Sequence, residues 1–166
     1  MIQIAAGNQS VTDLIDHFLT DRFSYSKWEH APTQPKIHCD VAFLGYSSWR
    51  REENGDANLS DEQVFVVRNG QVRFLNPRND LMNHSPDGLS WGYAGSGPAQ
   101  LALALLMEVL NDWERVQAIY QRFKAHFVAR IPQHTNWTAD GADVLELALT
   151  IEQASVNATS GQSSGQ

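Results

Sequence analysis

Two stretches near the start of the chain differ in the period of their apolar residues. Residues 11–23 have the helical spacing, and Ser10 precedes them as a candidate N-cap. The apolar residues of this predicted amphipathic helix are Val11, Leu14, Ile15, Phe18 and Leu19. Residues 36–46 instead alternate through Ile37, Cys39, Val41 and Phe43, which predicts a strand. Between strand and hairpin, residues 47–63 are polar and charged, and they predict an exposed loop.

The clearest local signal is a β-hairpin. Residues 63–68 and 71–75 are rich in valine and phenylalanine, and Asn69-Gly70 separates them. This pair tolerates the positive φ values of a type I′ turn, so we expect a tight hairpin. The following residues, 76–90, are rich in Asn, Asp, Pro and Gly and predict a long loop.

Three further helices are predicted in the second half of the chain. The first runs from Pro98 to Leu110, with Ser96 or Gly97 as cap, and it is apolar on every side from 101 to 107. The second runs from Trp113 to Arg130 after a cap at Asp112. The last follows a cap at Thr138 or Asp140 and carries apolar residues as far as Ile151. Asn111 makes the turn between the first and second of these helices tight, so those two helices are expected to lie side by side.

Together these elements predict an α+β fold. We expect a small antiparallel sheet that contains the hairpin, packed against a layer of about four helices. The 166 residues suit one domain over 1–153. Residues 154–166 are polar and low in complexity, and we expect them to form a disordered tail.

Composition and charge exclude several classes of protein. A net charge of −7 argues against general nucleic-acid binding, which depends on clustered Lys and Arg. The longest apolar run is too short to span a membrane, and the first residues lack the basic start of a secretory signal. The single cysteine, Cys39, forms no intramolecular disulfide, so a cytoplasmic location is expected.

The strongest candidate for chemistry is the junction before the apolar helix. Gly95, Ser96 and Gly97 precede Pro98, and glycines at a helix start let an anion approach the free backbone N–H groups. The stretch is not a Walker loop, a dinucleotide fingerprint or a nucleophile elbow. The alternative is a tight, glycine-rich entry to a buried helix. Gly97 would then be needed for its backbone conformation or for the close approach of another group.

A local positive patch lies next to this junction in the sequence. Residues 63–79 contain Arg68, Arg73 and Arg78 and no acidic residue, in a chain that is otherwise acidic. A guanidinium group from Arg73 or Arg78 could pair with a phosphate or carboxylate of a ligand. The alternative is that these arginines are solvated or pair with acids such as Asp80.

Four further side chains are candidates near the junction. His84 could act as a general base toward Ser96, but a side-chain hydrogen bond to the backbone of its own loop is the favoured interpretation. Tyr93 and Gln100 are candidate ligand contacts, whereas Trp91 suits the core. The scattered histidines and lone cysteine have no metal-ligand spacing, so neither a metal nor a cofactor is expected.

The stretch NHSPDGLSWGYAGSGPAQLALALLMEVL, followed by YQRFKAHFVARIP and Trp137, resembles a family of small proteins from bacteria, plasmids and phages. That family has an NHSPxGxxWGYxGSGPAQLALA core and no assigned function. The resemblance covers about residues 64–149 and implies a context in mobile elements. Residues 1–63 fall outside it and read as an addition.

Two hypotheses of function follow. The first is a non-catalytic binding module of a mobile element, which acts on a host protein partner or captures a small anionic, nucleotide-like ligand. The acidic N-terminal half suits a partner-docking face as well as a plain solvated surface. The second is an enzyme for a phosphorylated or nucleotide-like substrate at Gly95–Pro98. An incomplete catalytic set favours the first hypothesis.

Overall fold

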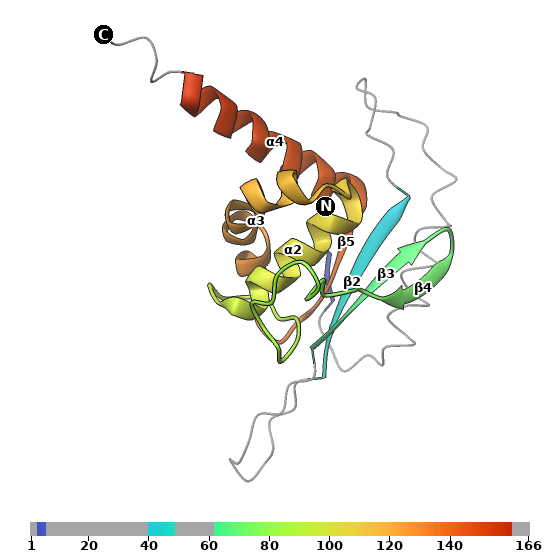
Figure 1. Cartoon of the computed structure of the whole chain (residues 1–166). Coiled ribbons are helices and arrows are strands. Elements are labelled where there is room, and N and C mark those ends of the chain that lie inside the picture. The colour runs from blue at the N-terminus through green and yellow to red at the C-terminus, as the bar shows by residue number, and fades with distance from the viewer. Residues whose placement is uncertain (1–2, 6–39, 49–61, 161–166) are drawn as a thin grey trace.

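The computed structural model describes residues 3–5, 40–48 and 62–160. Its sheet has five strands in the order β1-β5-β2-β3-β4, and every neighbouring pair is antiparallel. The strands are β1 (Gln3–Ala5), β2 (Val41–Ser47), β3 (Glu62–Arg68), β4 (Gln71–Phe74) and β5 (Asn136–Asp140). The helices are α2 (Ser96–Leu110), α3 (Trp113–His126), the 3-10 turn η1 (Val128–Arg130) and α4 (Gly141–Ser160). Figure 1 shows the sheet beside the helical layer.

The predicted α+β class and the hairpin are confirmed. β3 and β4 pair from Arg68↔Gln71 to Phe65↔Phe74, and Asn69 and Gly70 have φ values of 52° and 76°, as a type I′ turn requires. The part of the chain that the structure describes holds three α-helices, against the four or so predicted for the whole chain. The fourth predicted helix, 11–23, lies outside the described residues, as do 36–39 of the predicted strand.

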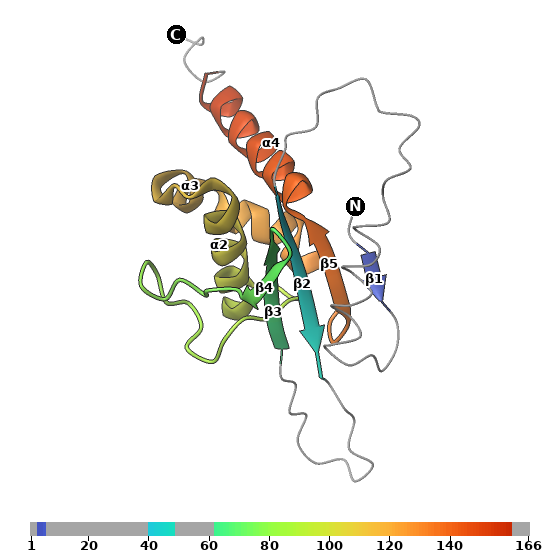
Figure 2. The same ribbon diagram turned by 90° about the vertical axis from the view of Figure 1, so that its right-hand side faces the viewer.

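The core lies between the sheet and α2. From Leu101 to Leu106 every residue of α2 is at most 1% exposed, as its all-apolar sequence predicts. Phe43 and Val66 face this helix from the sheet, and Phe123 and Ala148 reach the same core from α3 and α4. Figure 2 shows α2 and α3 on one side of the sheet. The described part of the chain contains no helix that is both long and apolar enough to cross a membrane.

Several boundaries differ from the prediction. α2 begins at Ser96 with Gly95 as N-cap, so Pro98 is its third residue; its missing N–H is still one of those without a helical partner. α3 ends at His126, because the chain tightens into η1. Asn111 caps α2 in the left-handed conformation, with φ 48°, and makes the predicted tight turn.

The region after Pro132 differs most. β5 was not predicted, and Thr138 lies inside it. Asp140 is the last residue of β5 and directly precedes α4. Its Oδ1 accepts a hydrogen bond from the Ala142 N–H, as expected of a cap. α4 continues to Ser160, past the predicted tail boundary at residue 154, although Val156 is 64% exposed. Residues 161–166 of the predicted tail lie outside the described residues.

Candidate functional site

The glycines before α2 accommodate side chains of the protein itself. A Cβ on Gly97 would lie 2.0 Å from Ser90 Oγ and 3.1 Å from the Tyr93 hydroxyl. A Cβ on Gly95 would lie 2.2 Å from Cε2 of the Tyr93 ring. Ser90 Oγ and the Tyr93 hydroxyl form a 2.7 Å hydrogen bond. Gly97 does not have positive φ, so the close approach, and not the backbone angle, explains why a glycine is needed here.

The two aromatic residues of this junction have different environments. Trp91 is fully buried and meets Trp137 edge to face, with ring centroids 5.7 Å apart, so its predicted place in the core is confirmed. Tyr93 is 43% exposed and covers the start of α2. The junction therefore packs one ring beneath the helix start and another over it.

Gln100 anchors the long loop to α2. Its side chain is fully buried, and its Oε1 accepts a 2.7 Å hydrogen bond from the His84 backbone N–H. Its amide nitrogen donates to the carbonyl oxygens of Pro77 and Met82. Both N–H donors and the oxygen of this amide thus bond within the protein, which gives Gln100 a structural role.

His84 is held by its backbone and by its ring. The imidazole stacks on Tyr120 with centroids 5.3 Å apart and an interplanar angle of 28°. Within the described residues its buried Nε2 has no hydrogen-bond partner, and His84 and Ser96 form no hydrogen bond with each other. In the described part of the chain, the hydrogen bond of His84 runs from its backbone N–H to Gln100 on α2, and not from its ring to its own loop as expected.

The three arginines of the positive patch all pair with carboxylates. Arg68 and Arg73 both donate to Oε1 of Glu108, in the last turn of α2. Arg78 binds both carboxylate oxygens of Asp80, at 3.0 Å through Nε and 3.0 Å through Nη2. This hydrogen bond lowers the pKa of Asp80 and raises that of Arg78. The structure therefore shows the pairing with acids that was the alternative to ligand binding.

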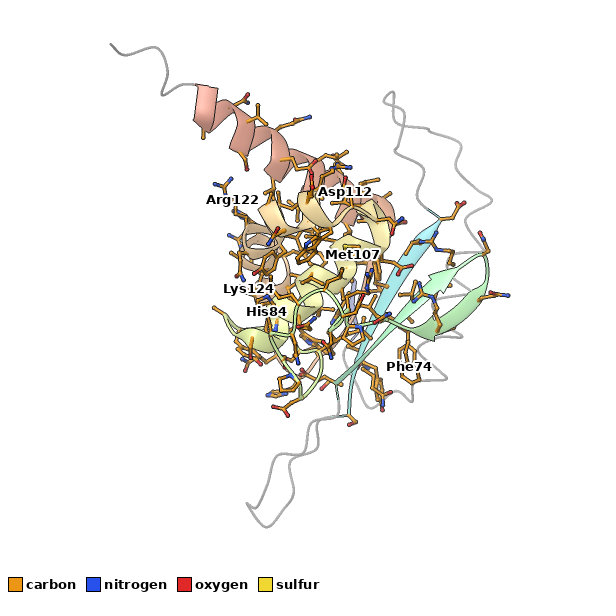
Figure 3. The ribbon with its side chains drawn as sticks, viewed as in Figure 1. Phe74, His84, Met107, Asp112, Arg122 and Lys124 are labelled. Atoms are coloured by element: carbon orange, nitrogen blue, oxygen red, sulfur yellow. The ribbon has the colours of Figure 1, made fainter. Side chains whose placement is uncertain are left out.

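The arginine pair and the glycine junction lie near opposite ends of α2. Twelve residues separate Ser96 from Glu108, which corresponds to about 18 Å along a helix. Tyr93, Gly95, Ser96 and Gly97 are at the start of α2, Arg73 is at its end, and His84 and Gln100 lie between. Figure 3 shows His84 on the helical side, well apart from Phe74 on β4.

A cavity of about 450 Å³ opens at the end of α2. Of the candidate ligand-binding residues, Arg78 lines this cavity, and Arg68 of the positive patch lines it as well. The other lining residues are Asp40, Val41, Asn76, Ala104, Met107, Glu108, Val109 and Asn111. Two arginines and two acids give this lining no net charge, so it attracts an anion less strongly than the sequence alone suggests. The described residues include no group of three His, Cys, Asp or Glu that could hold a metal ion.

The exposed apolar residues of β4 were missed by the sequence analysis. Phe74 is 64% exposed and Val72 is 36% exposed. They pair with Phe65 and Val67 of β3, which alternate with Val64 and Val66 of the helix-facing core. Both pairs, Phe74 with Phe65 and Val72 with Val67, therefore lie on the face away from α2. Only the alternation in QVRF could have indicated this, and it does not say which of these side chains stay exposed.

Glu62 is a second residue that the sequence analysis did not single out. Its side chain is only 9% exposed, and its Oε1 lies 3.9 Å from Nδ1 of His134. Burial raises the pKa of Glu62 to about 7, although a hydrogen bond from the Trp91 backbone N–H lowers it. A single glutamate in a polar loop boundary carries no sequence signal of such burial.

Comparison with known proteins gives a family. The model of a Family of unknown function (DUF6166) matches residues 50–151, which is more than half of the chain. The chain therefore belongs to this family. Searches of curated proteins and of solved structures found no match. The family confirms the resemblance in its coarse form, but its match begins at residue 50, so residues 50–63 do not fall outside it as predicted. The origin in mobile elements stays a prediction.

Proposed function

We propose that this protein is a non-catalytic binding module that acts on a protein partner, and that β4 is its contact surface. The observation that carries this proposal is the exposure of Phe74 on β4, the last strand of the sheet, where it pairs with the buried Phe65 of β3. Exposed aromatic residues are enriched at protein interfaces, where they provide much of the binding energy. A role in a mobile element, against a host protein, remains part of the proposal.

The β4 surface is small, which fits recognition of a short peptide segment. Apart from Phe74, the large apolar residues that are exposed in the described part of the chain are Val72, Tyr93 and Val156. Tyr93 bonds to Ser90 before the start of α2, and Val156 lies near the end of α4, on a different element from Phe74 and Val72. Phe74 and Val72 are thus the pair that shares one surface, and isolated exposed residues need no functional explanation.

A peptide display selection tests this function with a matched control. Random peptides would be selected on the purified protein and then measured against Phe74→Ser and Val156→Ser, because both residues are 64% exposed. We expect selected peptides to lose about ten-fold or more in affinity for Phe74→Ser and to keep it for Val156→Ser. Selected peptides that bind both variants equally would contradict the proposal.

A small anionic, nucleotide-like ligand is a second candidate, and the cavity beside Arg78 favours it. Calorimetric titration with nucleotides and their uncharged nucleosides tests it. Arg78 has φ 58°, so Arg78→Asn is the suitable variant because Asn tolerates this conformation. We expect about ten-fold weaker nucleotide binding in the variant. Absence of heat with millimolar nucleotide would remove this candidate, and with it the enzyme alternative.

A further inference from the structure

The hydrogen-bonding pattern of the hairpin determines which backbone groups of β4 point outward. The Leu75 N–H donates to the Val64 carbonyl at 2.8 Å, which makes this a hydrogen-bonded pair. Such pairs alternate along an antiparallel ladder, so Arg73 and Gln71 also bond to β3. The N–H and C=O groups of Val72 and Phe74 therefore point away from the sheet.

A side-chain contact agrees with this assignment. The Phe74 carbonyl oxygen accepts a 3.2 Å hydrogen bond from Nη1 of Arg73, as an outward carbonyl can. No strand of the described residues pairs with the outer edge of β4, which is last in the sheet order. An open edge of this kind is a template for another strand.

The charge beside this edge is positive. Arg73 pairs with Val66 in the register, so its side chain lies on the helix-facing side of β4. Arg73 and Arg68 share one oxygen of Glu108, and both side chains are 49% exposed. Two guanidinium groups and one carboxylate leave a net charge of +1 at the edge.

From these observations we propose that the partner adds to β4 as an extended antiparallel strand in which apolar residues flank an acidic one. This inference rests on the proposed function. The outward groups of Val72 and Phe74 bond to the partner backbone, as in other cases of strand addition. Residues directly opposite each other share a face, so apolar residues lie against Val72 and Phe74, and the acid lies opposite Arg73.

The same geometry disfavours one register of pairing with a second copy of this chain, the one in which both apolar residues of each β4 strand are used. If β4 paired with β4 of another copy so that Val72 met Phe74, Arg73 would lie directly opposite its own counterpart. Like charges directly opposite each other destabilise a sheet. A partner with an acidic residue at that position removes this repulsion.

Blocked heptapeptides in which valine alternates with glutamate test the inference on the full chain by calorimetry. In antiparallel addition the valine N–H groups face β4 and the glutamate N–H groups face away. We expect N-methylation of the valines to weaken binding about ten-fold or more, and N-methylation of the glutamates to have little effect. Equal affinities of the two methylated peptides, or no binding of the parent peptide at millimolar concentration, would overturn the inference.

A matched pair of arginine variants tests the acidic position. Arg68 and Arg73 have the same exposure and the same carboxylate partner, but Arg73 is the one that bonds to the Phe74 carbonyl. We expect Arg73→Gln to weaken binding of the parent peptide about three-fold and Arg68→Gln to weaken it less. Equal losses, or a lysine-containing peptide that binds wild type as well as the glutamate peptide does, would overturn the acidic preference. If peptides from the display selection depend on Phe74 while these peptides fail, the proposed function stands and this inference falls.

Discussion

The ring of Phe74 lies 4.9 Å from the ring of Phe65, centroid to centroid, yet Phe74 is 64% exposed and Phe65 only 7%. The buried ring of Phe65 on β3 thus packs against an exposed ring on the edge strand β4. We expect Phe74→Ala to cost about 1 kcal/mol of unfolding free energy through loss of the ring pair. Phe65→Ala should cost about 3–5 kcal/mol because it leaves a cavity. Denaturant titration of both variants measures this, and equal losses would show that Phe74 is a core residue.

Gln100→Leu should destabilise the protein strongly. Leucine leaves the carbonyls of Pro77 and Met82 and the N–H of His84 without the partner that Gln100 supplies. Unpaired buried polar groups cost about 1–3 kcal/mol each, so we expect a loss of about 3 kcal/mol or more unless water reaches them. Urea unfolding gives the value. A loss below about 1 kcal/mol would mean that the loop stays in place without this anchor.

Gly97→Ala should destabilise the protein through contact with Ser90. The new Cβ would push Ser90 Oγ away from its hydrogen bond with Tyr93, at a cost of about 1–2 kcal/mol. In a Ser90→Gly background the same change should cost much less, because the two Ser90 atoms are gone and only the Tyr93 hydroxyl, at 3.1 Å, remains close. A double-mutant cycle by thermal unfolding measures the coupling. Additive losses would show that Ser90 is not the reason for this glycine.

Glu62 should make stability depend on pH near neutrality. Its pKa is raised in the folded state to about 7 from 4.5, so its favourable contribution is complete below pH 4.5 and is lost as pH rises through 7. At pH 8 the buried carboxylate costs up to about 3 kcal/mol.

Glu62→Gln tests this, since the glutamine oxygen can still accept from the Trp91 N–H. We expect a higher melting temperature than wild type at pH 8 and no gain at pH 4. The exposed Glu146 on α4 provides the control variant, Glu146→Gln, with little change at either pH. A gain of the same size at both pH values would argue against titration of Glu62.

Local patterns predicted much of the fold. Asn69-Gly70 defines the hairpin because its turn chemistry lies within two residues, and the apolar run of α2 indicates a surrounded helix. β5 was missed because it is five residues long and its pairing is distant: Trp137 lies opposite Gly45, and its Nε1 occupies the space where a Cβ on Gly45 would be. Such a register depends on tertiary packing, which no local pattern contains.

The candidate site was predicted less well, for a similar reason. Arg73 meets Glu108 across 35 residues, and Gln100 meets Pro77 across 23. Residues that seem free or ligand-directed in the sequence are paired by folding. Conversely, alternation in β4 shows that Val72 and Phe74 share a face, but not that these two side chains stay exposed while Phe65 and Val67 on the same face are buried.

Amide hydrogen exchange at β4 tests the central claim most directly. Val72 and Phe74 N–H groups should exchange rapidly in the free protein, and a peptide from the display selection should slow both by about ten-fold or more at saturation. The N–H groups of Gln71 and Arg73 already bond to β3 and should change little. Unchanged exchange at Val72 and Phe74 with the peptide bound would contradict strand addition at this edge.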